Sequence, residues 1–326
     1  MTMIRTSPAI VAIAMGLAAS TAVLAAPRAA DLSLVGQYGE ATAPLTLFER
    51  DGALFLDGAG RSAARLVPEG AGLYRIEGGG ALKVSRRGVW LDGALLLRRD
   101  FGAKVQADIR KAVRADPATL RVRALAATPP VETADHRPAD LVDLATIDPA
   151  IRFDIRYATR NNFMGLKLYE RPAAYLQRPA AQALGRVQKV LEARGYGLLI
   201  HDAYRPWFVT WMFWEATPPE SHMFVADPAK GSRHNRGCAV DLTLYDLKTG
   251  QPVDMPGRYD EMSGRSYADF VGGTSAQRAH RQVLRDAMVA EGFEVYPEEW
   301  WHFDYRDWRG YGIGTETFTQ LAAAGR

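Results

Sequence analysis

One stretch of ten residues, 232–241, constrains the fold of this 326-residue chain more than any other, because it demands a loop followed by a strand. It has the form S-x-H-x-x-G-x-A-x-D and contains His234 and Asp241. The alternation at its end predicts a strand with Ala239 and Asp241 on one face and Cys238 on the other. A loop histidine and a strand carboxylate on the same side of a sheet can supply nitrogen and oxygen to Zn²⁺ at about 2 Å each.

A second short segment, E-W-W-H at 299–302, supplies the missing parts of such a site. His302 is the predicted third ligand, on another strand. Three protein ligands leave one coordination position open, which is typical of a catalytic zinc site rather than a structural one. Glu299 precedes the ligand by three residues, so it can reach water at the open position without binding the metal. We therefore predict one Zn²⁺ per chain, held by His234, Asp241 and His302, with Glu299 as the catalytic acid and base.

The remaining histidines lack a comparable pattern and are expected to be surface or hydrogen-bonded residues: His136, His201, His222 and His280. The single cysteine cannot form an intramolecular disulfide. Cys238 could be a thiolate ligand or a nucleophile, but the alternation turns it away from Asp241. We therefore interpret it as a small packed residue.

The charge balance argues against a nucleic-acid partner. The chain has 40 basic and 37 acidic residues and a formal net charge of +3, without a dense basic tract. At 48% hydrophobic it has ample material for more than one core. A small molecule or a peptide is the expected partner.

The first 26 residues have the features of a signal peptide. Arg5 precedes an apolar run at 9–24, and small residues suited to cleavage follow, with Ala25 or Ala26 as the predicted last residue removed. The run is short and Ala-rich for a retained membrane anchor. We expect an exported protein, periplasmic or secreted, with no transmembrane span in the mature chain.

Three further regions follow the signal peptide. Residues 31–101 alternate short apolar runs with Gly- and Asp-containing turns and contain no histidine, which predicts a small antiparallel all-β module. Residues 102–139 begin with helical spacing and continue as a proline-containing linker. Residues 140–326 mix helices and strands, including a helix after Pro179 and another for which Ser275 is the predicted cap.

This last region resembles the D-alanyl-D-alanine dipeptidases, the zinc peptidase family of the vancomycin-resistance dipeptidase. The motifs that carry the resemblance are F-D-I-R-Y-A-T at 153–159, N-F-M-G at 162–165, D-A-Y-R-P at 202–206 and the two segments above. The resemblance implies an α+β fold with a small antiparallel sheet flanked by helices, as in other D-Ala-D-Ala peptidases and the hedgehog domain. It also implies zinc-dependent hydrolysis of D-alanyl-D-alanine or related D,D-dipeptides in peptidoglycan metabolism.

The resemblance assigns further site residues. Arg205 would be the arginine that stabilises the transition state, although an ion pair with Asp202 is the alternative. Ser232 and Asp260 would hold the ends of the substrate, with Asp260 on the ammonium. Tyr157 lines the same pocket or belongs to the core. The sequence departs from the family at Pro256, where a glycine is usual, and this puts the shape of the Asp260 loop in doubt.

Two other functions stay open at this point. A D,D-carboxypeptidase would trim peptidoglycan stem peptides instead of free dipeptides. A non-catalytic, zinc-stabilised binding protein would use the same ligands for recognition, but it would have no need for Glu299 and Arg205. The β module lies outside the resemblance, and it could bind a ligand, shield the active site or dock to an envelope partner.

Overall fold

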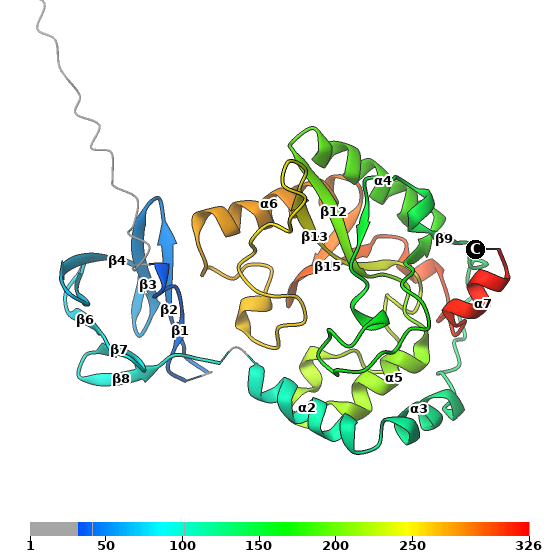
Figure 1. Ribbon diagram of the computed structural model, residues 1–326, viewed down its shortest axis with the longest axis horizontal. Helices are drawn as coiled ribbons and strands as arrows, with labels where there is room; N and C mark the ends of the chain where they lie inside the picture. The colour runs from blue at the N-terminus through cyan, green and yellow to red at the C-terminus, as the bar shows by residue number, and fades with distance from the viewer. Residues whose placement is uncertain (1–31, 41, 101, 326) are drawn as a thin grey trace, which may run out of the picture.

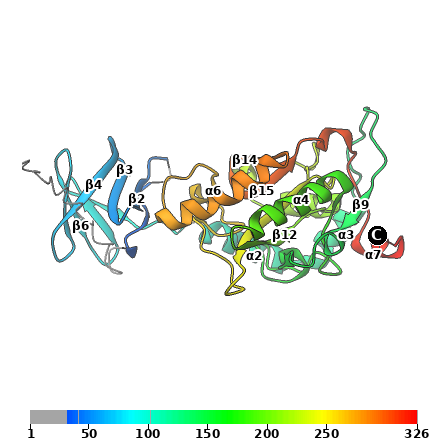
Figure 2. The same ribbon diagram turned by 90° about the horizontal axis from the view of Figure 1, so that it is seen from above.

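The computed structural model describes residues 32–40, 42–100 and 102–325, so the predicted signal peptide lies outside the described residues. The chain forms two lobes, a small β module and a larger lobe of helices and strands, which lie side by side (Figures 1 and 2). Among the described helices, none has the length and apolar character needed to cross a membrane.

The β module is a meander in which every strand pairs antiparallel with the next. Its strands are β1 (Gly36–Tyr38), β2 (Leu45–Arg50), β3 (Ala53–Gly58), β4 (Arg61–Gly70), β5 (Leu73–Ile76), β6 (Ala81–Val84), β7 (Gly88–Leu91) and β8 (Ala94–Leu97). The meander closes on itself, because Tyr38 bridges Arg98 and the Gly39 amide donates to the Leu97 carbonyl at 2.8 Å. The module is therefore a small barrel with its own core.

Every second side chain along these strands points into the barrel and fills its interior. Along β3, Leu54 and Leu56 are buried while their neighbours are partly exposed, and along β5 the same holds for Tyr74 and Ile76. These inward residues form one apolar cluster that is separate from the core of the larger lobe. The antiparallel pairing agrees with the prediction for this region.

The segment after the barrel begins with the predicted helix and differs from the predicted linker beyond it. It holds two helices, α2 (Ala103–Ala115) and α3 (Pro117–Ala126). Pro117 begins α3 instead of interrupting the chain, because a proline at the first helical position has no amide to satisfy and Asp116 caps the helix by accepting from the Thr119 amide at 3.0 Å. Both helices contribute buried residues to the core of the larger lobe, so only the chain after α3 has linker character.

The larger lobe is built around a five-stranded sheet with the order β10-β12-β13-β15-β14. All neighbours are antiparallel except β10 and β12, which are parallel. The elements are β9 (Leu141–Asp143), β10 (Arg152–Phe153), β11 (Tyr175–Gln177), α4 (Arg178–Glu192), β12 (Tyr196–Asp202), α5 (Trp207–Ala216), β13 (Ala239–Asp246), α6 (Ser275–Ala290), β14 (Phe293–Tyr296), β15 (Glu299–Tyr305) and α7 (Phe318–Ala323). Helices α4 and α6 pack on the sheet, and α2, α3 and α5 gather on the other side of the lobe (Figure 1).

Local sequence explains where the two sheet-covering helices start. Pro179 lies in the first turn of α4, as predicted. The cap of α6 is Thr274 rather than the predicted Ser275: the Thr274 hydroxyl accepts from the Gln277 amide at 3.1 Å, and the Gln277 side chain accepts from the Thr274 amide. Ser275 is instead the first helical residue, and its Oγ accepts from the Asp51 amide of the β module at 3.2 Å.

Candidate metal centre and active-site pocket

Strand pairing and one tight loop bring the three predicted ligands together. Asp241 in β13 lies directly opposite His302 in β15 in the sheet register. His234 comes from the loop before β13, where its amide donates to the Ser232 hydroxyl at 3.1 Å. Gly237 lets this loop turn, because its φ is +67° and an added Cβ would lie 2.5 Å from a Leu141 methyl group.

The ligand atoms have the spacing of a zinc site. The Nε2 of His234 lies 3.0 Å from the Nδ1 of His302, and the Oδ1 of Asp241 lies 3.3 Å and 3.0 Å from these two nitrogens. Ligands at the usual zinc distances and a tetrahedral angle are about 3.3 Å apart. All three side chains are buried.

The partners of the outer ring nitrogens orient both imidazole rings so that the inner nitrogens face Asp241. The Nδ1 of His234 faces the Ala203 carbonyl at 2.7 Å, and the Nε2 of His302 faces the Asp304 carboxylate at 2.9 Å. Each outer nitrogen therefore donates, and each inner nitrogen faces Asp241. In a metal-bound form these two nitrogens and the carboxylate would each offer a lone pair, so the donor set fits a bound metal ion.

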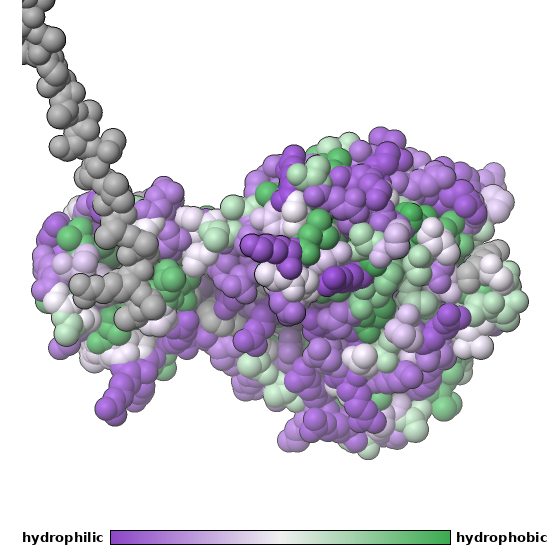
Figure 3. Space-filling model, turned by 45° about the horizontal axis from the view of Figure 1, so that its top comes forward, coloured by the Kyte–Doolittle hydropathy of each residue, from purple (hydrophilic) through white to green (hydrophobic). Residues whose placement is uncertain are grey.

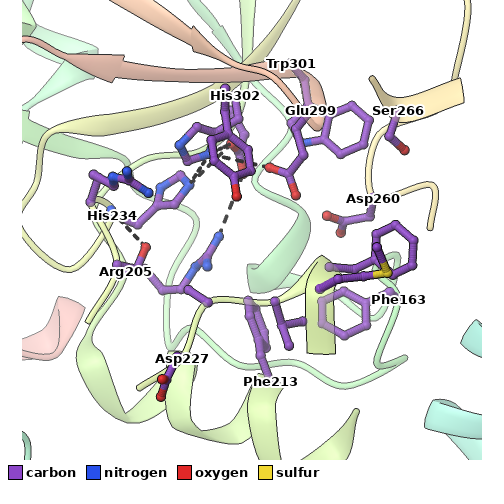
Figure 4. A pocket seen from close by; sticks show the side chains of 18 of the residues that line it. Phe163, Arg205, Phe213, Asp227, His234, Asp260, Ser266, Glu299, Trp301 and His302 are labelled. Atoms are coloured by element: carbon purple, nitrogen blue, oxygen red, sulfur yellow. Dashed lines mark hydrogen bonds and ion pairs between the residues drawn. The ribbon is translucent and has the colours of Figure 1, made fainter. Parts of the chain in front are cut away.

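Glu299 stands beside this centre at the start of β15. Its carboxylate lies 3.6 Å from the Nδ1 of His302 and points into the pocket between His302 and Asp260 (Figure 4). Burial, opposed by His302 and supported by Asp241, raises the pKa of Glu299 to about 7. A carboxyl group with such a pKa can both take up and release a proton near neutral pH.

Arg205 reaches the centre from the turn between β12 and α5. Its guanidinium contacts Asp202 at 2.8 Å and 2.9 Å and points to Asp241, 3.7 Å away (Figure 4). Although burial opposes its charge, the Asp202 carboxylate holds the pKa of Arg205 well above its usual value. Both sequence interpretations therefore describe it: Arg205 is paired with Asp202 and also faces the metal ligands.

The three predicted substrate-binding residues line the same pocket. The Tyr157 hydroxyl donates to the Asp260 carboxylate at 3.0 Å, so Tyr157 belongs to the pocket as well as to the core. Burial, with Asp241 and Glu299 nearby, raises the pKa of Asp260 well above its usual value. With Pro256 in its loop, Asp260 still faces the cavity (Figure 4).

Two residues that support the centre were not singled out from the sequence. Asp304 orients the His302 ring, and the Tyr259 hydroxyl donates to Asp241 at 3.0 Å. The signal for Asp304 was present, because residues two apart on a strand share a face. Tyr259 reaches Asp241 from a loop, and nothing local in the sequence indicates that contact.

The other candidate residues stay apart from the centre. Within the described part of the chain, one group of three metal-ligating side chains meets the spacing of a metal site, and it contains none of the other histidines. His201 is buried beside the Asp154 carbonyl, and burial lowers its pKa to about 4. Cys238 is fully buried and does not line the pocket.

The cavity above the centre has a volume of about 420 Å³, which is in the range of small-molecule sites. It combines acidic, basic and aromatic side chains. On the face of the larger lobe that Figure 3 shows, hydrophilic residues predominate, with smaller apolar patches between them. Such a pocket suits a small ligand with charges of both signs.

Comparison with known proteins identifies the larger lobe. Residues 137–317 match the model of the Peptidase_M15 family, described as D-ala-D-ala dipeptidase. A D-alanyl-D-alanine dipeptidase of Escherichia coli is 34% identical over 186 residues, which are 57% of this chain and 95% of the relative. Relatives of the same name from Enterococcus faecium and Streptomyces coelicolor are 37% and 36% identical, over 48% and 51% of this chain and 87% and 92% of their own lengths.

A solved LD-carboxypeptidase structure, LdcB, is 19% identical with a TM-score of 0.31 over 56% of this chain and 71% of its own, which is too little to support an argument. The family match begins at residue 137 and leaves out the β module. It covers more than half of the sequence and contains every residue of the pocket discussed above. The chain therefore belongs to the Peptidase_M15 family of D-ala-D-ala dipeptidases.

Proposed function

We infer that this chain is a metallopeptidase that hydrolyses D-alanyl-D-alanine or closely related D,D-dipeptides. The observation that carries this inference is the meeting of His234, Asp241 and His302 in one pocket with Glu299 beside them. We further propose that one zinc ion per chain occupies the three ligands.

When bound there, zinc supplies Lewis-acid chemistry, which activates water and polarises a carbonyl. In the proposed mechanism Glu299 accepts the proton of the attacking water and then delivers it to the leaving amine. Arg205 donates to the oxyanion that develops on the scissile carbonyl. Because Asp202 and the aromatic rings of Tyr157 and Phe213 fix this guanidinium, it needs no reorganisation during the reaction.

The substrate ends have plausible partners in the pocket. Asp260 lies near Glu299 and Asp241, whose charges raise its pKa more than Arg205 lowers it, so an ammonium group would relieve the crowding of negative charge. We propose that Asp260 binds the free ammonium of the dipeptide and that Tyr157 orients Asp260. We propose Ser232, which lies at the base of the His234 loop, as a partner of the other end.

A D,D-carboxypeptidase is the second candidate, because its substrates end in the same D-Ala-D-Ala unit. The buried Asp260 favours the dipeptidase, since an acylated amino end brings no charge to this carboxylate. A non-catalytic binding protein is disfavoured by the family match and by the placement of Glu299.

Three further points stay proposals. The first 26 residues are a signal peptide, and the protein acts in the periplasm or the medium on peptidoglycan-derived peptides. The β module docks to an envelope partner. The sheet and its covering helices are related to the hedgehog domain.

The direct test incubates purified, zinc-loaded protein with D-Ala-D-Ala, L-Ala-L-Ala and N-acetyl-D-Ala-D-Ala and measures free alanine. We expect rapid release from D-Ala-D-Ala, with the acetylated peptide at least tenfold slower. Absence of D-alanine release would refute the inference, and preference for the acetylated peptide would support the carboxypeptidase.

A further inference from the structure

Strand β2 is buried on both faces over its first five residues, as is the short neighbouring strand β1. Leu45 and Leu47 point into the barrel, as alternation requires. Thr46 and Phe48 lie on the outer face, yet they are only 5% and 2% exposed. Burial of an outer face in a small barrel means that something else covers it, and here the cover is the larger lobe.

The covering contacts lie at the start of α6 and in the loop before it. The Glu49 amide donates to the Gly273 carbonyl at 3.1 Å, and the Glu49 carboxylate accepts from the Ser275 amide at 2.7 Å. Arg278 of α6 donates to the Glu49 carbonyl at 2.6 Å and stacks over the Phe48 ring at 5.5 Å. The module is therefore held by directional bonds to one segment of the larger lobe.

The loop that leads into this segment forms a wall of the active-site pocket. Pocket residues from this loop are Asp260, Glu261, Met262 and Ser266. The chain leaving the barrel presses against it: an added Cβ at Gly102 would lie 2.5 Å from the Met262 carbonyl oxygen. One turn into α2, the Gln106 side chain donates to the Asp260 carbonyl at 2.7 Å.

The backbone of Asp260 needs such support. Its φ is +56°, in the left-handed region that a residue with a Cβ adopts at a cost. The bond from Gln106 fixes the carbonyl of this residue, and the bond from Tyr157 fixes its carboxylate. Loss of either bond would let the loop move toward an ordinary backbone conformation and carry the carboxylate away from the pocket.

We propose that the β module and α2 together brace the pocket loop at 255–268, and that Gln106 is the positioning residue that holds Asp260 for the substrate ammonium. The assignment of the ammonium rests on the proposed function. The bracing itself does not, because it concerns the conformation of the loop. This gives the module an intramolecular role in substrate selection.

The central experiment compares Gln106→Met with Gln282→Met in the full-length protein. Both replace a helical glutamine by a side chain of similar length without a donor, but Gln282 is exposed and bonds Asp286 of its own helix. We expect Gln106→Met to raise KM for D-Ala-D-Ala about three- to tenfold with kcat nearly unchanged, the loss expected for one hydrogen bond used in ground-state binding. Gln282→Met should match the wild type.

Hydrogen exchange supplies a readout independent of activity. We expect amides in 255–268 to exchange faster in Gln106→Met, while amides of β13 and β15 keep their protection. Arg278→Met, which detaches the module at its other contact, should loosen 45–50 and 255–268 together. Unchanged loop exchange in Gln106→Met, or faster exchange spread over the whole lobe, overturns the proposal.

A double-mutant cycle separates positioning from a general loss of stability. If Gln106 acts through Asp260, Gln106→Met should add nothing to the KM of Asp260→Asn, whereas independent effects would multiply. A wild type without dipeptidase activity would refute the proposed function, and loop exchange would still decide the bracing.

Discussion

The β module and the larger lobe differ in what they bury. The barrel buries one apolar cluster, and each strand pairs with its neighbour in sequence. The larger lobe buries a set of charged or ionisable groups, including Asp202, Arg205, Asp241 and His302. Its ligands come from segments 61 to 68 residues apart. The apolar core of the barrel thus stabilises its fold. In the larger lobe, buried charges cost free energy of folding, and these charged groups form the candidate active site.

The two regions also differ in whether their side chains are spaced to bind a metal ion. In the larger lobe, His234, His302 and Asp241 have the spacing of metal ligands. In the described residues of the barrel, no group of metal-ligating side chains has that spacing. Ion binding should therefore change one lobe and leave the other as it is, and this expectation can be tested.

Removing the metal should have the largest effect. Dialysis against a chelator should abolish D-alanine release, because the Lewis acid is lost. Restoring Zn²⁺ should recover it. Tryptophan fluorescence during denaturation can follow the lobe, since six of the seven tryptophans lie after residue 200. Equal loss of protection in the barrel, measured by hydrogen exchange, would contradict the separation of the two regions.

Glu299→Gln should come next. Loss of the acid and base is expected to lower kcat by about 10²- to 10⁴-fold while zinc content stays the same. The measurement is steady-state turnover of D-Ala-D-Ala beside metal analysis of the same sample. An active variant would remove Glu299 from the mechanism and favour a binding role for the site.

Asp304→Asn should have an intermediate effect. The amide keeps the shape but weakens the charged hydrogen bond that orients His302, so zinc affinity should fall about 10- to 100-fold. Competition with a chromogenic chelator measures this affinity, and activity should return at saturating zinc. A loss of activity that excess zinc does not reverse would show that Asp304 does more than support a ligand.

Leu56→Ala should have the smallest effect on chemistry. Leu56 is fully buried in the barrel, so its truncation is expected to destabilise the module by about 2 to 5 kcal/mol. Since the module contacts the loop and not the metal ligands, kcat should stay close to the wild-type value while KM rises. Denaturant unfolding gives the first quantity and steady-state kinetics the others. A matching fall in zinc affinity would show that the lobes form one cooperative unit.

Sequence reasoning succeeded where local pattern determines structure. The alternation at 239–241 and the E-W-W-H segment predict that Asp241 and His302 lie on strands, which the structure pairs directly, and Pro179 marks the start of α4. It failed where two local signals compete. Thr274 and Ser275 are both good caps, and tertiary contact with the β module decides between them.

Other features depend on contacts between distant residues. Closure of the barrel joins Tyr38 to Arg98, and the bond from Gln106 to Asp260 spans 154 residues. Neither contact produces a local sequence pattern from which it could be predicted. The helical start at Pro117 was interpreted as linker, because proline both begins helices and interrupts them, and only the Asp116 cap separates the two cases.

The buried thiol of Cys238 has a practical consequence. It lies next to the first residue of β13, with no exposed surface, and burial raises its pKa to about 12. In the native protein a maleimide or aromatic disulfide reagent cannot reach this sulfur atom, and the raised pKa keeps the thiol protonated and unreactive. The rate at which such a reagent modifies this one sulfur atom therefore measures how often the five-stranded sheet opens around β13. No engineered label is needed.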